Sequence, residues 1–392
     1  MRENKPDPSP ADRSHGDPSP DENGAAQDRS LPRRLFSVME TRDDLPRMPG
    51  FMAAVFILLA AGAAAASARI CSPAVPDDPM AAENIAGILA SLPFLPLAVT
   101  LYSITILLWR RVASLLCTPL SFGLMLLLGT RFSDAAVLSL AILPMAYAFA
   151  VSLISREDRF RRVMTLAIFA ACALGIAAAV RIGLDFGSPE NLRDAFMTAV
   201  PDMIGAALLG PAGGMQAASG EGAAAMLTSL SLYDTARSLF IMLPAYFGMF
   251  CVVLAWACDR IIRLLFAWLN CADVFTDEGA EVSMPVRFAA VYAAFLILSI
   301  LTPGSVFPMA RCMLQSVVLV MGLPCAAVGV RRIGERLSDS LFYMTREKLF
   351  TAMLLFVLFA AVGAYPFLLI TSAVGMISVL RRGRARDRGN NE

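Results

Sequence analysis

A series of long apolar segments separated by short charged ones is the feature that most restricts how this chain can fold. An α-helix needs about 20 apolar residues to cross the hydrocarbon core of a bilayer. Backbone groups in lipid must be hydrogen-bonded within the protein, so long apolar segments of this kind are expected to be helical. The segments occupy about 50–68, 84–109, 112–129, 135–154, 163–180, 237–258, 288–308, 313–330 and 349–380. They predict an all-α, polytopic integral membrane helical bundle with about eight spanning helices and a proline-broken C-terminal helix pair.

Composition agrees with a membrane chain and excludes one class of partner. Hydrophobic residues make up 57% of the sequence and charged residues only 17%, whereas soluble domains hold about 25% charged residues. The formal net charge is +1, which argues against general affinity for nucleic acid. We therefore expect the lipid bilayer to be a partner and nucleic acid not to be one.

The positions of the arginines predict the orientation, because basic residues in short loops stay in the cytoplasm. Residues 1–48 form a polar, low-complexity segment that we expect to be a disordered cytoplasmic tail. Residues 49–380 are predicted to form the transmembrane domain, with an extracytoplasmic amphipathic insertion at 182–236. The basic residues 381–392 are predicted to form a second cytoplasmic tail. The expected location is the bacterial cytoplasmic membrane, with both termini inside.

Two charged stretches and a short helix are placed at the cytoplasmic face by the same pattern. The stretch 156–162, "REDRFRR", and the charges at 259–263 are interpreted as loops that anchor the topology. The following segment 261–271 has one charge and Trp268, so it is predicted to be a separate helix lying at the interface.

The last apolar segment is too long for one crossing and contains Pro366 near its middle. One crossing would place the arginines after residue 380 outside, whereas two would return them to the cytoplasm. Each half would span only about 23 Å at 1.5 Å per residue. We expect a broken hairpin; a re-entrant pair and one long tilted helix are the alternatives.

Residue types that carry catalysis or metal binding are scarce. The single histidine is His15, in the polar tail, and the eight cysteines show no metal-ligand spacing. Neither an ATP-binding GxxxxGK[ST] motif nor an HExxH or GxSxG motif occurs in the chain. We therefore expect no catalytic residue, no cofactor and no metal. A lipid-handling enzyme that uses Glu157 and Asp158 remains an alternative.

Polar residues and helix breakers inside the apolar segments are the candidates for lining a cavity, since interrupted helices can form substrate sites near the midplane. The competing interpretation is that they join helices together. The candidates are Pro96, Thr100, Tyr102, Tyr246, Gln315, Gly322 and Pro366.

Several stretches resemble a known family. "PFLPLAVTLYSITILLWRR", "LPMAYAFAVSLISRED", "SLFIMLPAYFGMFCVVLAWACDRIIR" and "VLVMGLPCAAVGVRRIG" resemble the YybS-like bacterial membrane proteins, which are similar to the S components of energy-coupling-factor transporters. The resemblance covers about residues 84 to 386 and implies a protein of unknown function that binds a small molecule. The ending "VGMISVLRR" departs from the family because it carries no acidic residue.

Two functions follow as expectations. The first is a non-enzymatic, S-component-like binding or transport subunit for a small neutral or amphipathic ligand, dependent on a separate ATPase and coupling module. The alternative is a membrane scaffold that recruits envelope, division or sporulation proteins through its N-terminal tail.

Overall fold

The computed structural model describes residues 49–71, 87, 90–109, 117–155, 157–201, 223–269, 284–303, 308–340 and 364–389, and these contain helices and no strands. The named helices are α2 (Gly50–Cys71), α4 (Phe94–Leu108), α6 (Cys117–Leu127), α7 (Phe132–Ile154), α8 (Arg159–Asp185), α10 (Ala223–Trp268), α11 (Val286–Leu301), α12 (Pro308–Ser340) and α14 (Ala364–Gly389). The predicted all-α class is confirmed.

Six helices of the described residues are long and apolar enough to cross a membrane, namely α2, α7, α8, α10, α12 and α14. Three shorter apolar helices, α4, α6 and α11, fall on the other predicted segments. The chain is therefore a polytopic helical membrane protein.

Helix α4 shows why a predicted segment can be longer than its helix. The apolar run begins near residue 84, but the helix begins after Pro93 and has 15 residues. At 1.5 Å per residue it is about 22 Å long. Almost all of its side chains are buried in the largest core. The helix is therefore surrounded by protein over most of its length.

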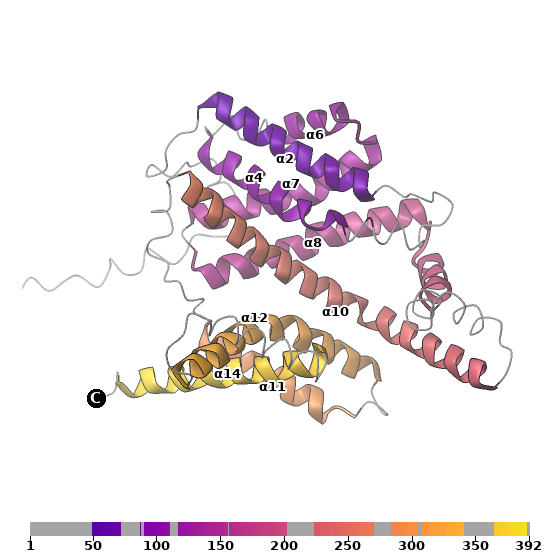
Figure 1. Ribbon diagram of the computed structural model, residues 1–392, viewed down its shortest axis with the longest axis vertical. Helices are drawn as coiled ribbons and strands as arrows, with labels where there is room; N and C mark the ends of the chain where they lie inside the picture. The colour runs from indigo at the N-terminus through magenta and orange to yellow at the C-terminus, as the bar shows by residue number, and fades with distance from the viewer. Residues whose placement is uncertain are drawn as a thin grey trace, which may run out of the picture.

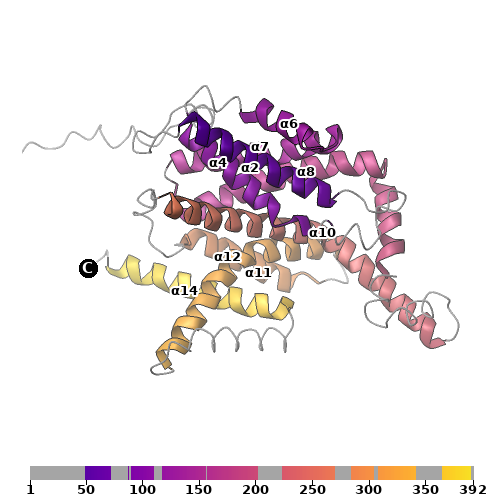
Figure 2. The same cartoon turned by 45° about the horizontal axis from the view of Figure 1, so that its top comes forward.

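The helices form two groups that meet at α10. Buried residues of α2, α4, α6, α7, α8 and α10 form one large core, drawn in the upper part of Figure 1. Residues of α11, α12 and α14 form a smaller core together with Phe160 of α8. Helix α10 packs on both α8 and α12 and lies between the two groups in Figures 1 and 2.

Glycines let α12 and α14 pack backbone against backbone. A Cβ atom at Gly329 would overlap the carbonyl oxygen of Thr371, and one at Gly375 would overlap the carbonyl oxygen of Cys325. Nearby, the hydroxyls of Tyr292 on α11 and Ser372 on α14 are hydrogen-bonded at 2.6 Å. These contacts join the three helices of the smaller group.

Helix α14 begins two residues before Pro366, where a proline costs no internal hydrogen bond. Arg331 and Arg332 near the end of α12 line the same pocket as Arg382 near the end of α14, and the two helices pack on one another (Figure 1). The two helices therefore run in the same direction. The first half of the predicted C-terminal pair, up to residue 363, lies outside the described residues.

The prediction of a separate interfacial helix at 261–271 is wrong. Helix α10 runs without a break from Ala223 to Trp268 and includes Pro244. It also passes through residue 236, where the predicted insertion was to end. Of that insertion, residues 189–201 are helical, and the ring of Phe196 contacts Phe240 of α10 at 5.3 Å between centroids. Residues 202–222 and the predicted tail 1–48 lie outside the described residues.

Candidate functional site

A buried carboxylate, Asp259 on α10, is shared by three arginines. Arg159 donates from Nε to Oδ2 at 2.9 Å, and Arg162 donates from Nη2 to Oδ1 at 2.8 Å. Arg263, one turn along α10, donates from Nε to Oδ2 at 3.2 Å. The side chain of Asp259 is 0% exposed, and those of Arg159 and Arg162 are 6% and 1% exposed. One carboxylate thus meets three guanidinium groups, which leaves a formal excess of positive charge.

The helix positions explain this geometry. Arg159 and Arg162 lie three residues apart at the start of α8, so both side chains point from one face of the helix. That face packs on α10, where Asp259 and Arg263 are spaced by four residues. These four residues therefore lie in helices and not in loops, and their role as topology anchors stays a prediction. They form an ion-pair network between two helices.

A pocket lies next to the network, between α8 and α10 on one side and α12 and α14 on the other. Its volume is about 440 Å³, within the range of roughly 300–1,000 Å³ that is usual for small-molecule sites. Its walls are largely apolar, with Val253, Trp256 and Leu323 among them. Arginines from all four helices also line it, and they are Arg159, Arg260, Arg331, Arg332 and Arg382. Among its described lining residues, no aspartate or glutamate occurs.

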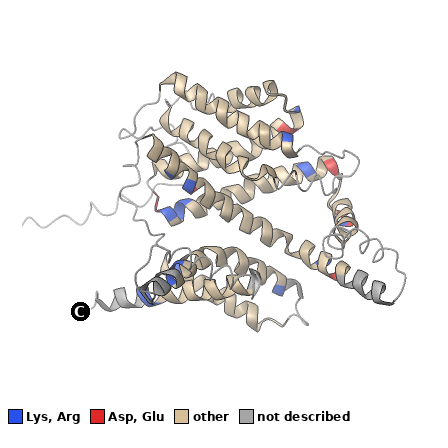
Figure 3. Ribbon diagram, viewed as in Figure 1, with Lys and Arg blue, Asp and Glu red and all other residues tan. Residues whose placement is uncertain are grey.

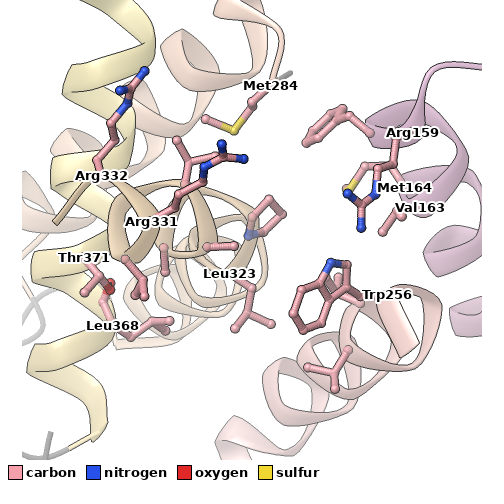
Figure 4. A pocket seen from close by; sticks show the side chains of 18 of the residues that line it. Arg159, Val163, Met164, Trp256, Met284, Leu323, Arg331, Arg332, Leu368 and Thr371 are labelled. Carbon is pink, nitrogen blue, oxygen red and sulfur yellow. The ribbon is translucent and has the colours of Figure 1, made fainter. Parts of the chain in front are cut away.

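Figure 4 shows Arg159 and Trp256 on one side of the pocket and Arg331 and Leu323 across from them. Two arginines of the pocket, Arg159 and Arg260, are held in place by their neighbours. The guanidinium carbon of Arg260 lies 5.2 Å from the centre of the Trp256 ring, a cation–π arrangement. Arg159 is held through Nε by Asp259. Its Nη2 atom is buried and has no hydrogen-bond partner among the described residues. The pocket therefore presents a fixed, partly unsatisfied cationic group.

The charged residues divide between the two ends of the bundle (Figure 3). At the end opposite the pocket, Arg181 of α8 pairs with Asp134 of α7 and with Asp185. The arginines that line the pocket come from the positions that the charge pattern assigns to the cytoplasmic side. The pocket arginines of α8, α10, α12 and α14 thus lie at one end of the bundle, and the orientation of that end in the membrane stays a prediction.

The seven predicted cavity candidates do not gather at this pocket. Pro96, Thr100 and Tyr102 are buried in the large core on α4, and the hydroxyl of Thr100 donates to the carbonyl of Pro96 at 2.8 Å. Tyr246 is 47% exposed on α10, and Gln315 is half-buried on α12.

Gly322 lies against the Tyr292 hydroxyl, and Pro366 is exposed at the start of α14. None of the seven lines the pocket described here, and their role at any other cavity stays a prediction.

Sequence reasoning missed the residues that do form the site. These arginines lie in the charged stretches between apolar segments, so from the sequence they serve only to predict the orientation of the chain. A usable signal was present: Asp259 follows the apolar segment directly, and Arg260 and Arg263 follow it within about one helical turn. The carboxylates of the alternative enzyme, Glu157 and Asp158, do not line the pocket.

The fold and the site define a class of protein: a polytopic helical membrane protein with an arginine-lined, apolar pocket between two helix groups. No family model, curated protein or solved structure matches the chain. Within the described residues, no group of three or more histidine, cysteine, aspartate or glutamate side chains could hold a metal ion.

Proposed function

We propose that this chain is a membrane-embedded binding subunit of the transport type, which holds a small amphipathic molecule between its two helix groups. The observation that carries the proposal is the pocket itself. It combines apolar walls such as Leu323 and Trp256 with a set of arginines contributed by four different helices. A ligand that filled it would touch both groups at once.

The position of the pocket supports a binding subunit in which the two groups move relative to one another. Apart from α10, α8 reaches the smaller group through Phe160, whose ring contacts Phe288 of the α11 helix at 5.0 Å. The pocket interrupts the packing between α8, α10, α12 and α14. A ligand bound there would alter how the groups meet, which is the physical requirement for coupling binding to transport.

The resemblance to YybS-like proteins and S components is compatible with this proposal and adds a partner. The chain has no ATP-binding loop of its own. The proposed subunit therefore depends on a separate ATPase and coupling protein, docked at the end of the bundle that carries the arginines.

The test is native mass spectrometry of the protein purified gently from its own membrane, with variants that fill the pocket. Ala327 lines the pocket and is exposed, so Ala327→Trp should occupy the cavity without disturbing a packed core. Ala290→Trp is the matched control, because Ala290 is exposed on α11 and does not line the pocket.

We expect the wild type and Ala290→Trp to retain a stoichiometric small molecule and Ala327→Trp to lose it. Equal retention by all three proteins would place the ligand elsewhere and refute the proposal. An empty wild-type protein that carries envelope or division proteins would favour the scaffold instead.

A further inference from the structure

The guanidinium of Arg159 is a buried and only partly satisfied group at the pocket. The side chain is 6% exposed, it lines the pocket, and its Nη2 has no partner among the described residues. Arginine at such a site is suited to phosphate, because its planar group offers several N–H donors in a fixed geometry. The neighbouring Asp259 is already shared with Arg162 and Arg263, so it cannot neutralise Arg159 fully. The site is chemically matched to an anion.

The apolar wall indicates where that anion comes from. Val253 and Trp256 line the pocket and are 51% and 45% exposed on α10. Helix α10 is long and apolar enough to cross a membrane, so this apolar wall lies on a spanning helix. The arginines lie near the ends of the spanning helices α8, α10, α12 and α14. Basic pockets between helices at this depth are suited to phosphate headgroups.

We propose that the ligand of this pocket is an anionic lipid whose phosphate is bound by Arg159 and Arg260, with its acyl chain against the apolar wall at Val253 and Trp256. This inference rests on the proposed function and gives its substrate class. Asp259 acts as a positioning residue, because it holds Arg159 through Nε, whereas Nη2 has no hydrogen-bond partner among the described residues. Trp256 does the same for Arg260.

The test measures binding of dioctanoyl phosphatidic acid to the purified full-length protein by native mass spectrometry. Dioctanoyl phosphatidylcholine serves as the zwitterionic comparison and sodium phosphate as the free anion. Three variants accompany the wild type: Arg159→Gln, Arg260→Gln and Arg161→Gln. The last is the matched control, since Arg161 is exposed on the same helix as Arg159 and does not line the pocket.

We expect saturable binding of the phosphatidic acid and binding at least about tenfold weaker for phosphatidylcholine and free phosphate. Removing one charge-assisted hydrogen bond should weaken binding about tenfold or more in Arg159→Gln. Arg260→Gln should act in the same direction, and Arg161→Gln should bind like the wild type. If Arg159→Gln does not fold, Arg260→Gln and the lipid comparison still test the inference.

Three results would overturn it. Equal binding of phosphatidylcholine would remove the anion requirement, and equal binding of free phosphate would identify a soluble anion as the ligand. An equal loss in Arg161→Gln would show that binding depends on the general positive charge of this end and not on the pocket. In each case the Ala327→Trp experiment still decides whether the pocket binds a molecule, so the proposed function is judged separately.

Discussion

Replacing Asp259 by asparagine removes the carboxylate on which Arg159, Arg162 and Arg263 converge. The substitution keeps the size of the side chain and changes little except its charge. In the wild-type protein, the two carboxylate oxygens of Asp259 accept hydrogen bonds from three guanidinium groups at 2.8 to 3.2 Å. After the change, buried positive charges would face one another without an anion between them.

The expected loss can be worked from the burial. Asp259 is 0% exposed, and its partners Arg159 and Arg162 are 6% and 1% exposed. Removing one partner of a buried ion pair costs roughly 3–5 kcal/mol, because the remaining charge stays desolvated. Typical domains have only about 5–15 kcal/mol of stability. Asp259→Asn should therefore lose a large share of the folding free energy.

The matched control is Asp185→Asn at the opposite end of the bundle. Asp185 also pairs with an arginine, Arg181, at 2.7 Å, but the two side chains are 33% and 35% exposed. Arg181 also keeps Asp134 as a partner. Ion pairs exposed to this degree contribute about 0–1 kcal/mol. The assay is thermal unfolding of the detergent-purified proteins. Unfolding is monitored as the loss of the monodisperse peak in size-exclusion chromatography after heating.

An Asp259→Asn protein as stable as Asp185→Asn would refute the argument that the network is buried and paired. A double variant, Arg162→Gln with Asp259→Asn, gives a second check. The two residues are in contact, so their effects should not add. We expect the double variant to be more stable than the sum of the two single losses predicts.

Other predictions concern helix packing and orientation. Gly375→Ala should destabilise the protein by roughly 1–3 kcal/mol through overpacking, since the new methyl would meet the backbone of Cys325. The control Gly123→Ala has open space around the new methyl and should not destabilise the protein. Equal melting curves for the two variants would contradict the close α12–α14 contact. Tyr292→Phe should lower the free energy of unfolding by about 0.5–1.5 kcal/mol, because it removes the 2.6 Å hydrogen bond to Ser372. An unchanged melting temperature in the same assay would contradict a stabilising role for that hydrogen bond. When fused to the C-terminus of this chain, green fluorescent protein should fluoresce and alkaline phosphatase should be inactive, because the arginines after residue 380 are predicted to be cytoplasmic. The reverse pattern would show that the predicted orientation is inverted.

The helical class and the position of most helices could be predicted because hydropathy is a local property. The segments 50–68, 135–154 and 163–180 correspond to α2, α7 and α8, with ends shifted by a few residues. Their apolar character is summed along the chain and does not depend on which helix lies beside which. The predicted ends of other helices differ more from the structure: the segment 237–258 corresponds to α10, which continues through residues 259–268.

The site could not be predicted because its parts are far apart in the sequence. Asp259 is 100 residues from Arg159 and 97 from Arg162. Each of these charged residues lies at the edge of an apolar segment. A charged loop residue that sets the topology occupies the same kind of position, so the sequence pattern does not distinguish the two. Burial distinguishes the two cases, and burial depends on the neighbouring helix.

From the sequence alone, therefore, one can conclude that the chain is a bundle of membrane helices and expect its arginines to lie mainly at one end. The first conclusion follows from the free energy of moving each apolar segment from water into lipid, and the second from the preference of basic residues in short loops for the cytoplasm. Only the tertiary structure decides that α8 and α10 share Asp259, and that arginines of α8, α10, α12 and α14 meet around one apolar pocket. Those facts depend on helix packing, where glycines such as Gly329 and Gly375 set the approach of α12 to α14. No single segment contains that information.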